Sequence, residues 1–178
     1  QRPAQQGLTL ESAIPTSRIL IFDGEIETRN LLVDFLAMSG HSVLSSGSAD
    51  EALRLIQAHS IKLAVVDADR PGGFELISRL QVDYPDVYLL AMSASDDVDQ
   101  VVKIMRSGAS DYVAKPFKIG SVVKQVDRGL IQQASETENI ELRSALALYG
   151  LADRLKESSD LLVSLKLVAS TALAQLKA

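Results

Sequence analysis

Four polar residues stand at the ends of short apolar runs, and their side chains suit phosphoryl chemistry. Asp23 follows RILIF, Asp67 ends IKLAVVD, Ser93 ends VYLLAMS, and Lys115 follows DYVA. Two carboxylates held together repel each other unless a cation lies between them, and Mg²⁺ commonly binds one or two carboxylates. A lysine and a hydroxyl can bind anionic oxygens, and an aspartate is a competent nucleophile toward phosphorus. If the four ends meet, the set predicts phosphoryl chemistry at Asp67.

Each of these residues taken alone has a simpler explanation. An aspartate at the end of a strand often caps the next helix, a serine there is usually a turn residue, and a single lysine is usually a solvated charge. The presence of all four at equivalent ends is what favours a site.

The elements that must bring these residues together are apolar runs that alternate with segments of helical periodicity. The runs at 18–23, 41–45, 61–67, 87–93 and 111–114 suit strands buried on both faces. Five helical segments lie between and after these runs. The first extends from Ile26 to before Gly40, and the second begins at Ser48 or Asp50, with Glu51 placed for a capping box. The others extend from Phe74 to Val82, over 96–108, and from after Pro116 to about Gln133. This alternation predicts an α/β fold with a doubly wound, five-stranded parallel sheet. Ligands bind such sheets outside the carboxyl ends of the strands.

Composition excludes several classes of function. The 178 residues carry a net charge of −5 and only 18 Lys and Arg, so we expect no direct nucleic-acid binding. Cysteine is absent and only His41 and His59 offer imidazoles, which disfavours a zinc site. No apolar run reaches the length of a membrane span, and the first residues lack the apolar stretch of a signal peptide. We expect a soluble cytoplasmic protein, with the missing initiator Met suggesting a trimmed chain or a fragment.

An ordered set of motifs over residues 18 to 134 resembles the receiver domains of two-component response regulators. ILIFDGE resembles the acidic opening, and LAVVDADRP resembles the phosphoacceptor strand with Pro71 after the acceptor. AMSA supplies a switch hydroxyl at Ser93, and GASDYVAKPF supplies Tyr112, Lys115 and Pro116. The resemblance implies a flavodoxin-like sheet with strand order 2-1-3-4-5.

The same resemblance assigns roles to these residues. Asp67 would accept phosphate from a histidine kinase or phosphotransfer protein, and Lys115 would pair with the phosphoryl oxygens. Mg²⁺ would be held by Asp23, Asp67 and the backbone carbonyl of Asp69. Ser93 would bind the new phosphate, and Tyr112 would swing inward. The Lys115–Pro116 bond would be cis, aiming Lys115 into the pocket. In physical terms an added anion reorganises a bistable loop.

Three departures from the family pattern concern the acidic pocket. Gly24 stands where the family has a second acid, so Mg²⁺ affinity should fall unless Glu25 or the Asp69 side chain compensates. Only two glycines separate Pro71 from Phe74, a shorter loop than is usual. Arg70 replaces a position that is often apolar, and it either reaches over the pocket to neutralise Asp67 or points into solvent. These changes raise the prospect of a receiver that has lost phosphorylation.

The sequence predicts three parts: a flexible leader at 1–17, a receiver domain at 18–134 and a helical extension at 135–178. The extension carries an apolar series with near-heptad spacing, which must pack on the receiver, a second copy or a partner helix. The series consists of Leu148, Leu151, Leu155, Leu162, Leu165, Ala169, Leu173 and Leu176. We expect dimerisation or partner binding there, with a possible helix break at Gly150 or at 158–160.

Three functions are compatible with these observations. The first is a phosphorylated receiver that signals through its helical tail, and the second is a pseudo-receiver that acts only as an interaction module. Neither is an enzyme, beyond self-catalysed phosphotransfer. The third is a phosphatase similar to haloacid dehalogenases, because Asp67-Ala68-Asp69 resembles their D-x-D nucleophile motif. That family places the motif on its first strand and adds an acidic motif after the lysine, where this sequence offers only Asp127.

Overall fold

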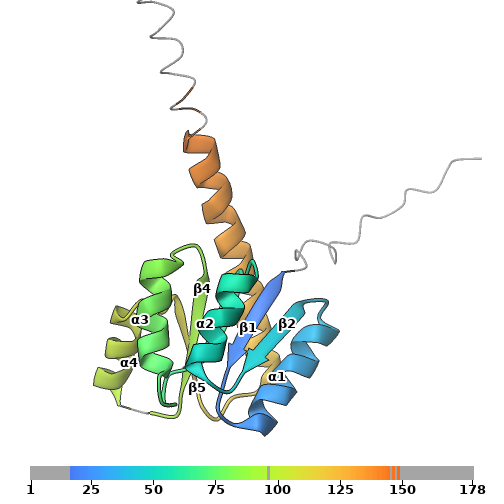
Figure 1. Ribbon diagram of the computed structural model, residues 1–178, viewed down its shortest axis with the longest axis vertical. Helices are drawn as coiled ribbons and strands as arrows, with labels where there is room; N and C mark the ends of the chain where they lie inside the picture. Colours follow the sequence, from blue (N-terminus) through green and yellow to red (C-terminus); the bar gives the residue numbers. More distant parts are fainter. Residues whose placement is uncertain (1–16, 96, 145, 147, 149–178) are drawn as a thin grey trace, which may run out of the picture. The chain divides into compact units, whose positions relative to one another are not determined.

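The computed structural model of the chain describes residues 17–95, 97–144, 146 and 148. The chain divides into two compact units, residues 1–135 and 136–178. In the first unit strands and helices alternate along the chain (Figure 1). They are β1 Arg18–Phe22, α1 Ile26–Met38, β2 Ser42–Ser46, α2 Ala49–Ala58, β3 Leu63–Asp67, α3 Gly73–Asp83, β4 Tyr88–Ser93, α4 Val98–Arg106 and β5 Asp111–Ala114. Residues 119–135 are helical and complete the unit.

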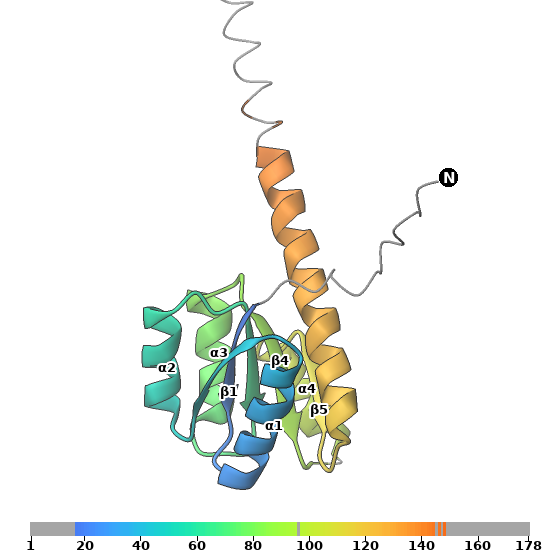
Figure 2. The same cartoon turned by 90° about the vertical axis from the view of Figure 1, so that its right-hand side faces the viewer.

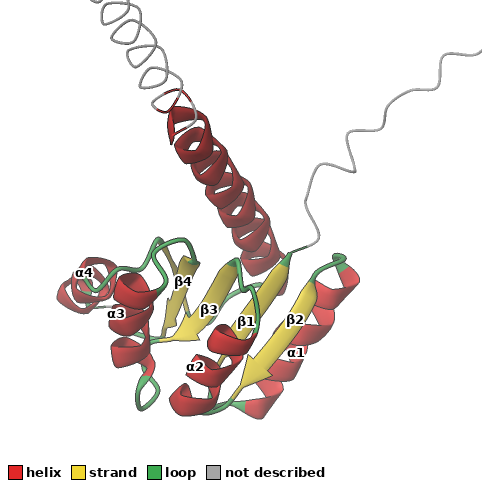
Figure 3. Cartoon of the chain, turned by 45° about the horizontal axis from the view of Figure 1, so that its top comes forward, coloured by secondary structure: helices red, strands yellow, loops and turns green. Residues whose placement is uncertain are grey.

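The five strands form one parallel sheet in the order β2-β1-β3-β4-β5. Figure 3 shows β4, β3, β1 and β2 side by side in this sheet. Ile19 of β1 pairs with Val43 of β2 on one side and with Leu63 of β3 on the other. The doubly wound fold and its strand order are therefore as predicted. Because every strand runs the same way, all five carboxyl ends lie along one edge of the sheet.

Helices cover both faces of the sheet (Figure 2), and an apolar layer lies on each face. On one face Ile56 of α2, Leu80 of α3 and Ile104 of α4 pack against strand residues such as Leu20 and Val66. On the other face α1 and the helical residues 119–135 contribute Leu32, Leu36, Val122, Val126 and Leu130. The β3 residues are buried throughout, which explains why this strand reads as a continuous apolar run.

Two helix ends differ from the sequence prediction. Ser48 is the N-cap of α2 and its hydroxyl accepts from the Glu51 N–H at 3.3 Å, but the reciprocal half of the capping box is missing. The Ser48 N–H donates instead to the hydroxyl of Ser46, which donates to the Glu51 carboxylate at 2.7 Å. The last helical segment also does not end near residue 133, as the sequence predicts, because residues 134 and 135 are helical too.

In the second unit the described residues 136–144, 146 and 148 are helical. Four large apolar side chains there are exposed: Ile140, Leu142, Leu146 and Leu148. The rest of the predicted apolar series, from Leu151 to Leu176, and the proposed break at Gly150 lie outside the described residues. None of the helices in the described part of the chain combines the length and apolarity that a bilayer crossing requires.

Candidate functional site

Sheet pairing places the two predicted carboxylates side by side. β1 and β3 are neighbours with Phe22 opposite Val66, so the next residues in each chain, Asp23 and Asp67, emerge together at the carboxyl edge. Both are buried, with 0% and 1% of their surface exposed. Buried carboxylates are costly unless cations or hydrogen bonds compensate them, so the groups around them define what the site can do.

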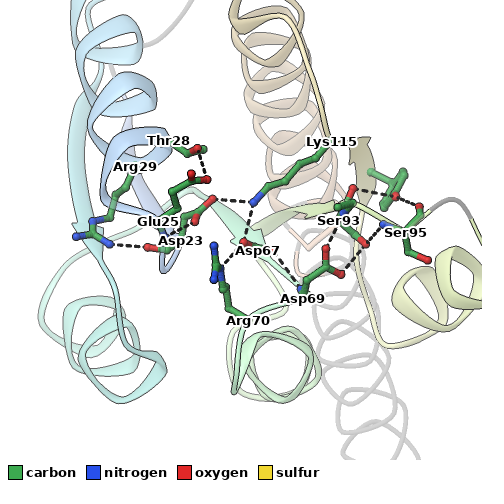
Figure 4. Close-up of polar contacts among 12 residues, drawn as sticks. Asp23, Glu25, Thr28, Arg29, Asp67, Asp69, Arg70, Ser93, Ser95 and Lys115 are labelled. Atoms are coloured by element: carbon green, nitrogen blue, oxygen red, sulfur yellow. Dashed lines mark hydrogen bonds and ion pairs between the residues drawn. The ribbon is translucent and has the colours of Figure 1, made fainter.

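Lys115 bridges the two carboxylates (Figure 4). Its ammonium lies 2.9 Å from Asp23 Oδ2 and 2.7 Å from Asp67 Oδ2. Burial by itself lowers the pKa of Lys115, but the hydrogen bonds and negative charges of Asp67 and Asp23 outweigh it, and the net pKa is raised. The Lys115–Pro116 peptide bond is cis. The lysine is thus a fixed positive charge beside Asp67.

Arg70 supplies a second cation to Asp67. Its Nε lies 3.3 Å from Asp67 Oδ2, while 43% of its side chain stays exposed to solvent. The arginine side chain passes over Gly24: a Cβ atom there would lie 3.1 Å from Arg70 Cδ and 3.2 Å from its Nε. Of the two orientations left open by the sequence, Arg70 takes the one over the pocket, and the small residue at position 24 makes room for it.

Both glycines of the short loop after β3 are required by its geometry. Gly72 has a φ of +81°, a conformation that other residues rarely adopt. Gly73 lies so close to Asp67 that a Cβ atom there would collide with the aspartate's backbone carbonyl oxygen. The Gly73 N–H donates to the carbonyl of Arg70 at 2.8 Å, which closes the turn. The compact loop therefore holds Arg70 next to Asp67.

The Asp69 side chain reaches to the end of β4. Its Oδ1 accepts from the Ser93 hydroxyl at 2.7 Å, and its Oδ2 accepts from the Ala94 N–H at 2.6 Å. Its own N–H donates to Asp67 Oδ1 at 3.1 Å. The sequence predicts that the backbone carbonyl of Asp69 binds the metal, and it makes the Asp69 side chain a candidate to compensate for Gly24. No pattern in the sequence indicates these two contacts, which join residues 24 or more positions apart.

The half-buried Tyr112 lies against the same loop. Its hydroxyl donates to the carbonyl oxygens of Ser95 at 3.2 Å and Ser93 at 3.4 Å. The Ser95 N–H in turn donates to the Ser93 hydroxyl oxygen at 3.0 Å. Ser93 is fully buried, so it connects the carboxylate of Asp69 to the segment that Tyr112 contacts.

The loop from β1 to α1 is held by contacts that the sequence did not suggest. The Glu25 N–H donates to Asp23 Oδ1 at 2.8 Å, and Arg29 Nη1 donates to the Asp23 carbonyl at 2.6 Å. The Glu25 carboxylate accepts from the Thr28 hydroxyl at 2.8 Å. A basic residue in the first turns of a helix is too common a pattern to have singled out Arg29.

The side chains of the pocket meet only some of the requirements for binding a hard cation such as Mg²⁺. Asp23 and Asp67 are carboxylates of the kind that Mg²⁺ prefers, and one or two of them suffice when water and phosphate oxygens complete the shell. Within the described residues, however, no three Asp, Glu or His side chains cluster closely enough to hold a metal ion. Lys115 and Arg70 already compensate the two carboxylates, so a bound cation would share them with two positive side chains.

A cavity of about 350 Å³ opens beside Lys115. Glu25, Thr28 and Leu31 of the first loop and α1 line one side, and Ala94, Pro116, Phe117 and Ile119 line the other. Its walls are mainly apolar, with a carboxylate and an ammonium among them. The cavity adjoins the site at Lys115, and neither Asp23 nor Asp67 is among the residues that line it.

Asp127 does not belong to this edge. Its carboxylate lies 3.2 Å from Nε2 of the buried His41, which immediately precedes β2 and so stands at the amino end of the sheet. The dehalogenase-like hypothesis needed an acid after Lys115 near the pocket, and the D-x-D motif lies on the third strand rather than the first. The geometry therefore provides no support for a phosphatase of that kind.

The comparisons with known proteins agree on one family. The family described as "Response regulator receiver domain" matches residues 19–127. "Response regulator protein FleR" of Pseudomonas aeruginosa is 31% identical over 124 residues, which cover 68% of this chain and 26% of that protein. "DNA-binding transcriptional regulator NtrC" of Azospirillum brasilense is 32% identical over 63% of this chain and 24% of its own length. The chain thus spans about a quarter of these relatives.

Among solved structures, NtrX from Brucella abortus superposes with a TM-score of 0.67 at 26% identity, over 71% of this chain and 30% of that chain. A CheY-like receiver domain protein from Methanospirillum hungatei JF-1 gives a TM-score of 0.64 over 67% of this chain and 98% of its own. The latter is 24% identical, so it supports the fold alone.

Proposed function

Because the chain belongs to the response regulator receiver domain family of two-component signalling, we propose that Asp67 accepts a phosphoryl group from a histidine kinase or phosphotransfer protein. The observation that carries this proposal is Lys115, whose ammonium joins Asp67 and Asp23 at the carboxyl edge of the sheet. The domain is a signalling module, and the transfer is made to its own side chain.

In the proposed transfer an Asp67 carboxylate oxygen attacks phosphorus, a P–O bond forms, and the P–N bond to the partner's histidine breaks. The imidazole leaves with the bonding electron pair. Lys115 lies 2.7 Å from Asp67 Oδ2 and would pair with the phosphoryl oxygens as negative charge accumulates there.

Mg²⁺ would be held by Asp23, Asp67 and the backbone carbonyl of Asp69. When bound, it neutralises charge on the phosphoryl oxygens. Its affinity should be low, because Gly24 supplies no carboxylate and Arg70 places a positive charge on Asp67. The Glu25 carboxylate is turned to Thr28 and that of Asp69 to Ser93 and Ala94, so compensation by either would need these contacts to change.

The signal from a modified Asp67 would pass through Ser93 and Tyr112. Ser93 stands at the end of β4, and the Tyr112 hydroxyl contacts the carbonyls of Ser93 and Ser95. A new anion at Asp67 would draw the Ser93 hydroxyl toward it, and the segment that Tyr112 holds would follow.

A pseudo-receiver that is never phosphorylated is the second candidate, and one observation favours it. Asp67 already has two cationic partners, Lys115 and Arg70, so its charge is compensated without metal or phosphate. In that case the domain serves as a protein-interaction module of the same fold.

The helical extension at 135–178 would dimerise or bind a partner helix, and the receiver would occupy 18–134. The leader predicted at 1–17 lies, except for residue 17, outside the described residues. The exposed Leu142 and Leu146 support dimerisation or partner binding, because side chains four positions apart lie on one face of a helix and an exposed apolar face favours association. Light scattering of the chain with and without residues 135–178 tests the proposal. A monomer in both forms excludes the dimer.

The phosphoacceptor proposal is tested by incubating the chain with acetyl phosphate and Mg²⁺ and measuring the intact mass. We expect the addition of one phosphoryl group to the wild type and none to Asp67→Asn. Beryllofluoride with Mg²⁺ should shift backbone NMR signals near the site in the wild type only. Failure of both reagents to modify or shift the wild type would favour the pseudo-receiver.

A further inference from the structure

The Asp69 carboxylate is bound as an anion at the end of β4 (Figure 4). Each of its oxygens has a separate donor, the Ser93 hydroxyl at 2.7 Å and the Ala94 N–H at 2.6 Å, from consecutive residues. Hydrogen bonds to a charged acceptor are roughly twice as strong as neutral ones. These contacts therefore fix the beginning of the loop after β4 to the loop after β3.

The two donors are fully used by these contacts. A serine hydroxyl has one proton to donate, and that of Ser93 goes to Asp69, while its oxygen accepts from the Ser95 N–H at 3.0 Å. The Ala94 N–H is likewise committed to Asp69. Any other anion that is to bind Ser93 and Ala94 must first displace the Asp69 carboxylate.

We propose that the Asp69 carboxylate is an internal anion that takes the place of a phosphoryl group at Ser93 and Ala94, and so holds the loop after β4 in position while Asp67 is unmodified. The inference rests on the proposed function, in which Ser93 and Tyr112 relay the state of the site. Asp69 is a positioning residue, because it acts through Ser93 and Ala94.

Tethering makes the internal anion effective. Asp69 lies two residues from Asp67 and its N–H donates to Asp67 Oδ1, so its carboxylate is held close to Ser93 at a high effective concentration. A phosphoryl group on Asp67 would place further negative charge beside this carboxylate, and like charges repel. Phosphate would therefore compete with Asp69 for the same donors.

The hydrogen bonds of Tyr112 agree with a loop after β4 that is already held in position. Its hydroxyl already contacts the carbonyls of Ser93 and Ser95, on the segment whose first two residues bind Asp69. The expected consequence is a receiver whose switch is set in the absence of phosphate and is released when Asp69 is lost.

The test uses the full chain with Asp69→Ala, Asp69→Asn and the control Asp34→Ala, which removes the same charge from an exposed position of α1. The readouts are the ¹H–¹⁵N shift and hydrogen-exchange rate of the Ala94 amide. Loss of a hydrogen bond worth about 1.4 kcal/mol accelerates exchange about tenfold. We expect this acceleration in Asp69→Ala, a smaller one in Asp69→Asn, whose amide has one acceptor oxygen, and none in Asp34→Ala.

A second arm adds beryllofluoride and Mg²⁺. In Asp69→Ala the added anion should restore the protection of the Ala94 amide from exchange. In the wild type this amide is already protected by Asp69 before the anion is added. The proposal is overturned if Ala94 exchanges equally fast in Asp69→Ala and the wild type. Because Asp69 is exposed, both variants should fold, and a thermal melt followed by circular dichroism verifies this.

The two proposals fail separately. If Asp69→Ala loses Ala94 protection while acetyl phosphate labels neither protein, the internal anion stands and the phosphoacceptor proposal fails. If acetyl phosphate labels Asp67 while Ala94 is indifferent to the loss of Asp69, the internal anion fails and the phosphoacceptor stands.

Discussion

The side chain of Arg70 lies across Gly24 on its way to Asp67. A Cβ atom at Gly24 would stand 3.1 Å from Arg70 Cδ, and Arg70 Nε is 3.3 Å from Asp67 Oδ2. The two unusual residues are 46 positions apart in the sequence (70 − 24 = 46) and form one feature of the pocket. Position 24, which the cationic side chain of Arg70 crosses, therefore carries a glycine and no carboxylate.

Replacing Arg70 with Ala should strengthen Mg²⁺ binding. The substitution removes a positive charge from Asp67, and since a partly exposed ion pair contributes up to about 1 kcal/mol, we expect the Kd to fall by about three- to fivefold in calorimetric or NMR titrations. Arg79→Ala, which breaks an exposed pair with Asp83 on α3, is the matched control and should leave the Kd unchanged. Equal affinity in the wild type and Arg70→Ala would mean that the guanidinium does not compete with the cation.

Placing an aspartate at Gly24 should also strengthen Mg²⁺ binding, because it adds an oxygen ligand. The new Cβ would crowd Arg70, whose flexible side chain can turn outward or pair with the new acid. We therefore expect a larger gain for Gly24→Asp combined with Arg70→Ala than for Gly24→Asp alone. The same titration run on the single and double variants measures the coupling, and a double variant no better than Gly24→Asp alone would argue against it.

Removing the charge of Lys115 should destabilise the fold. Lys115→Met leaves the buried Asp23 and Asp67 facing each other with only Arg70 as a cationic partner, and breaking a buried ion pair costs about 3 kcal/mol or more. Urea unfolding at neutral pH measures the loss. Added Mg²⁺ should recover part of it in Lys115→Met, and a variant as stable as the wild type would contradict the bridging role.

The contribution of Lys115 should vanish at high pH. Its pKa is raised in the folded chain, so the protonated form favours folding. This stabilisation is fully present below the ordinary lysine pKa of about 10.4 and is lost as the pH rises through the folded-state value. The difference in unfolding free energy between the wild type and Lys115→Met should therefore be constant from pH 7 to 9 and narrow above it. A difference that persists unchanged at pH 12 would point to packing rather than charge.

Substituting Gly73 with Ala should disturb the acceptor directly. The added Cβ collides with the backbone carbonyl of Asp67, and backbone atoms cannot turn away as a side chain can, so we expect a loss of about 2 kcal/mol or more in urea unfolding. Gly120→Ala is the matched control, because nothing lies within 4 Å of its added Cβ. In a helix that change should be neutral or stabilising by up to about 1 kcal/mol. Similar stabilities for the two variants would refute the close approach.

The sequence by itself determined the fold and which strand ends meet at one edge of the sheet. Continuous apolar runs separated by amphipathic segments require a sheet buried on both faces, and parallel strands necessarily bring Asp23, Asp67, Ser93 and Lys115 to one edge. The glycine pair after Pro71 likewise predicts a tight turn, since Gly72 has a backbone conformation that other residues rarely adopt.

Only the tertiary structure decided which charges meet at that edge. Arg70 had two open orientations, and Asp69, Glu25 and Arg29 have flexible side chains whose partners depend on distances of a few ångströms between separate loops. Periodicity reports which face of an element is buried, but it contains no information on such distances. The contact of Asp69 with Ser93 and Ala94, on which the switch is proposed to depend, arises from loop positions fixed jointly by β3, β4 and the compressed turn between β3 and α3.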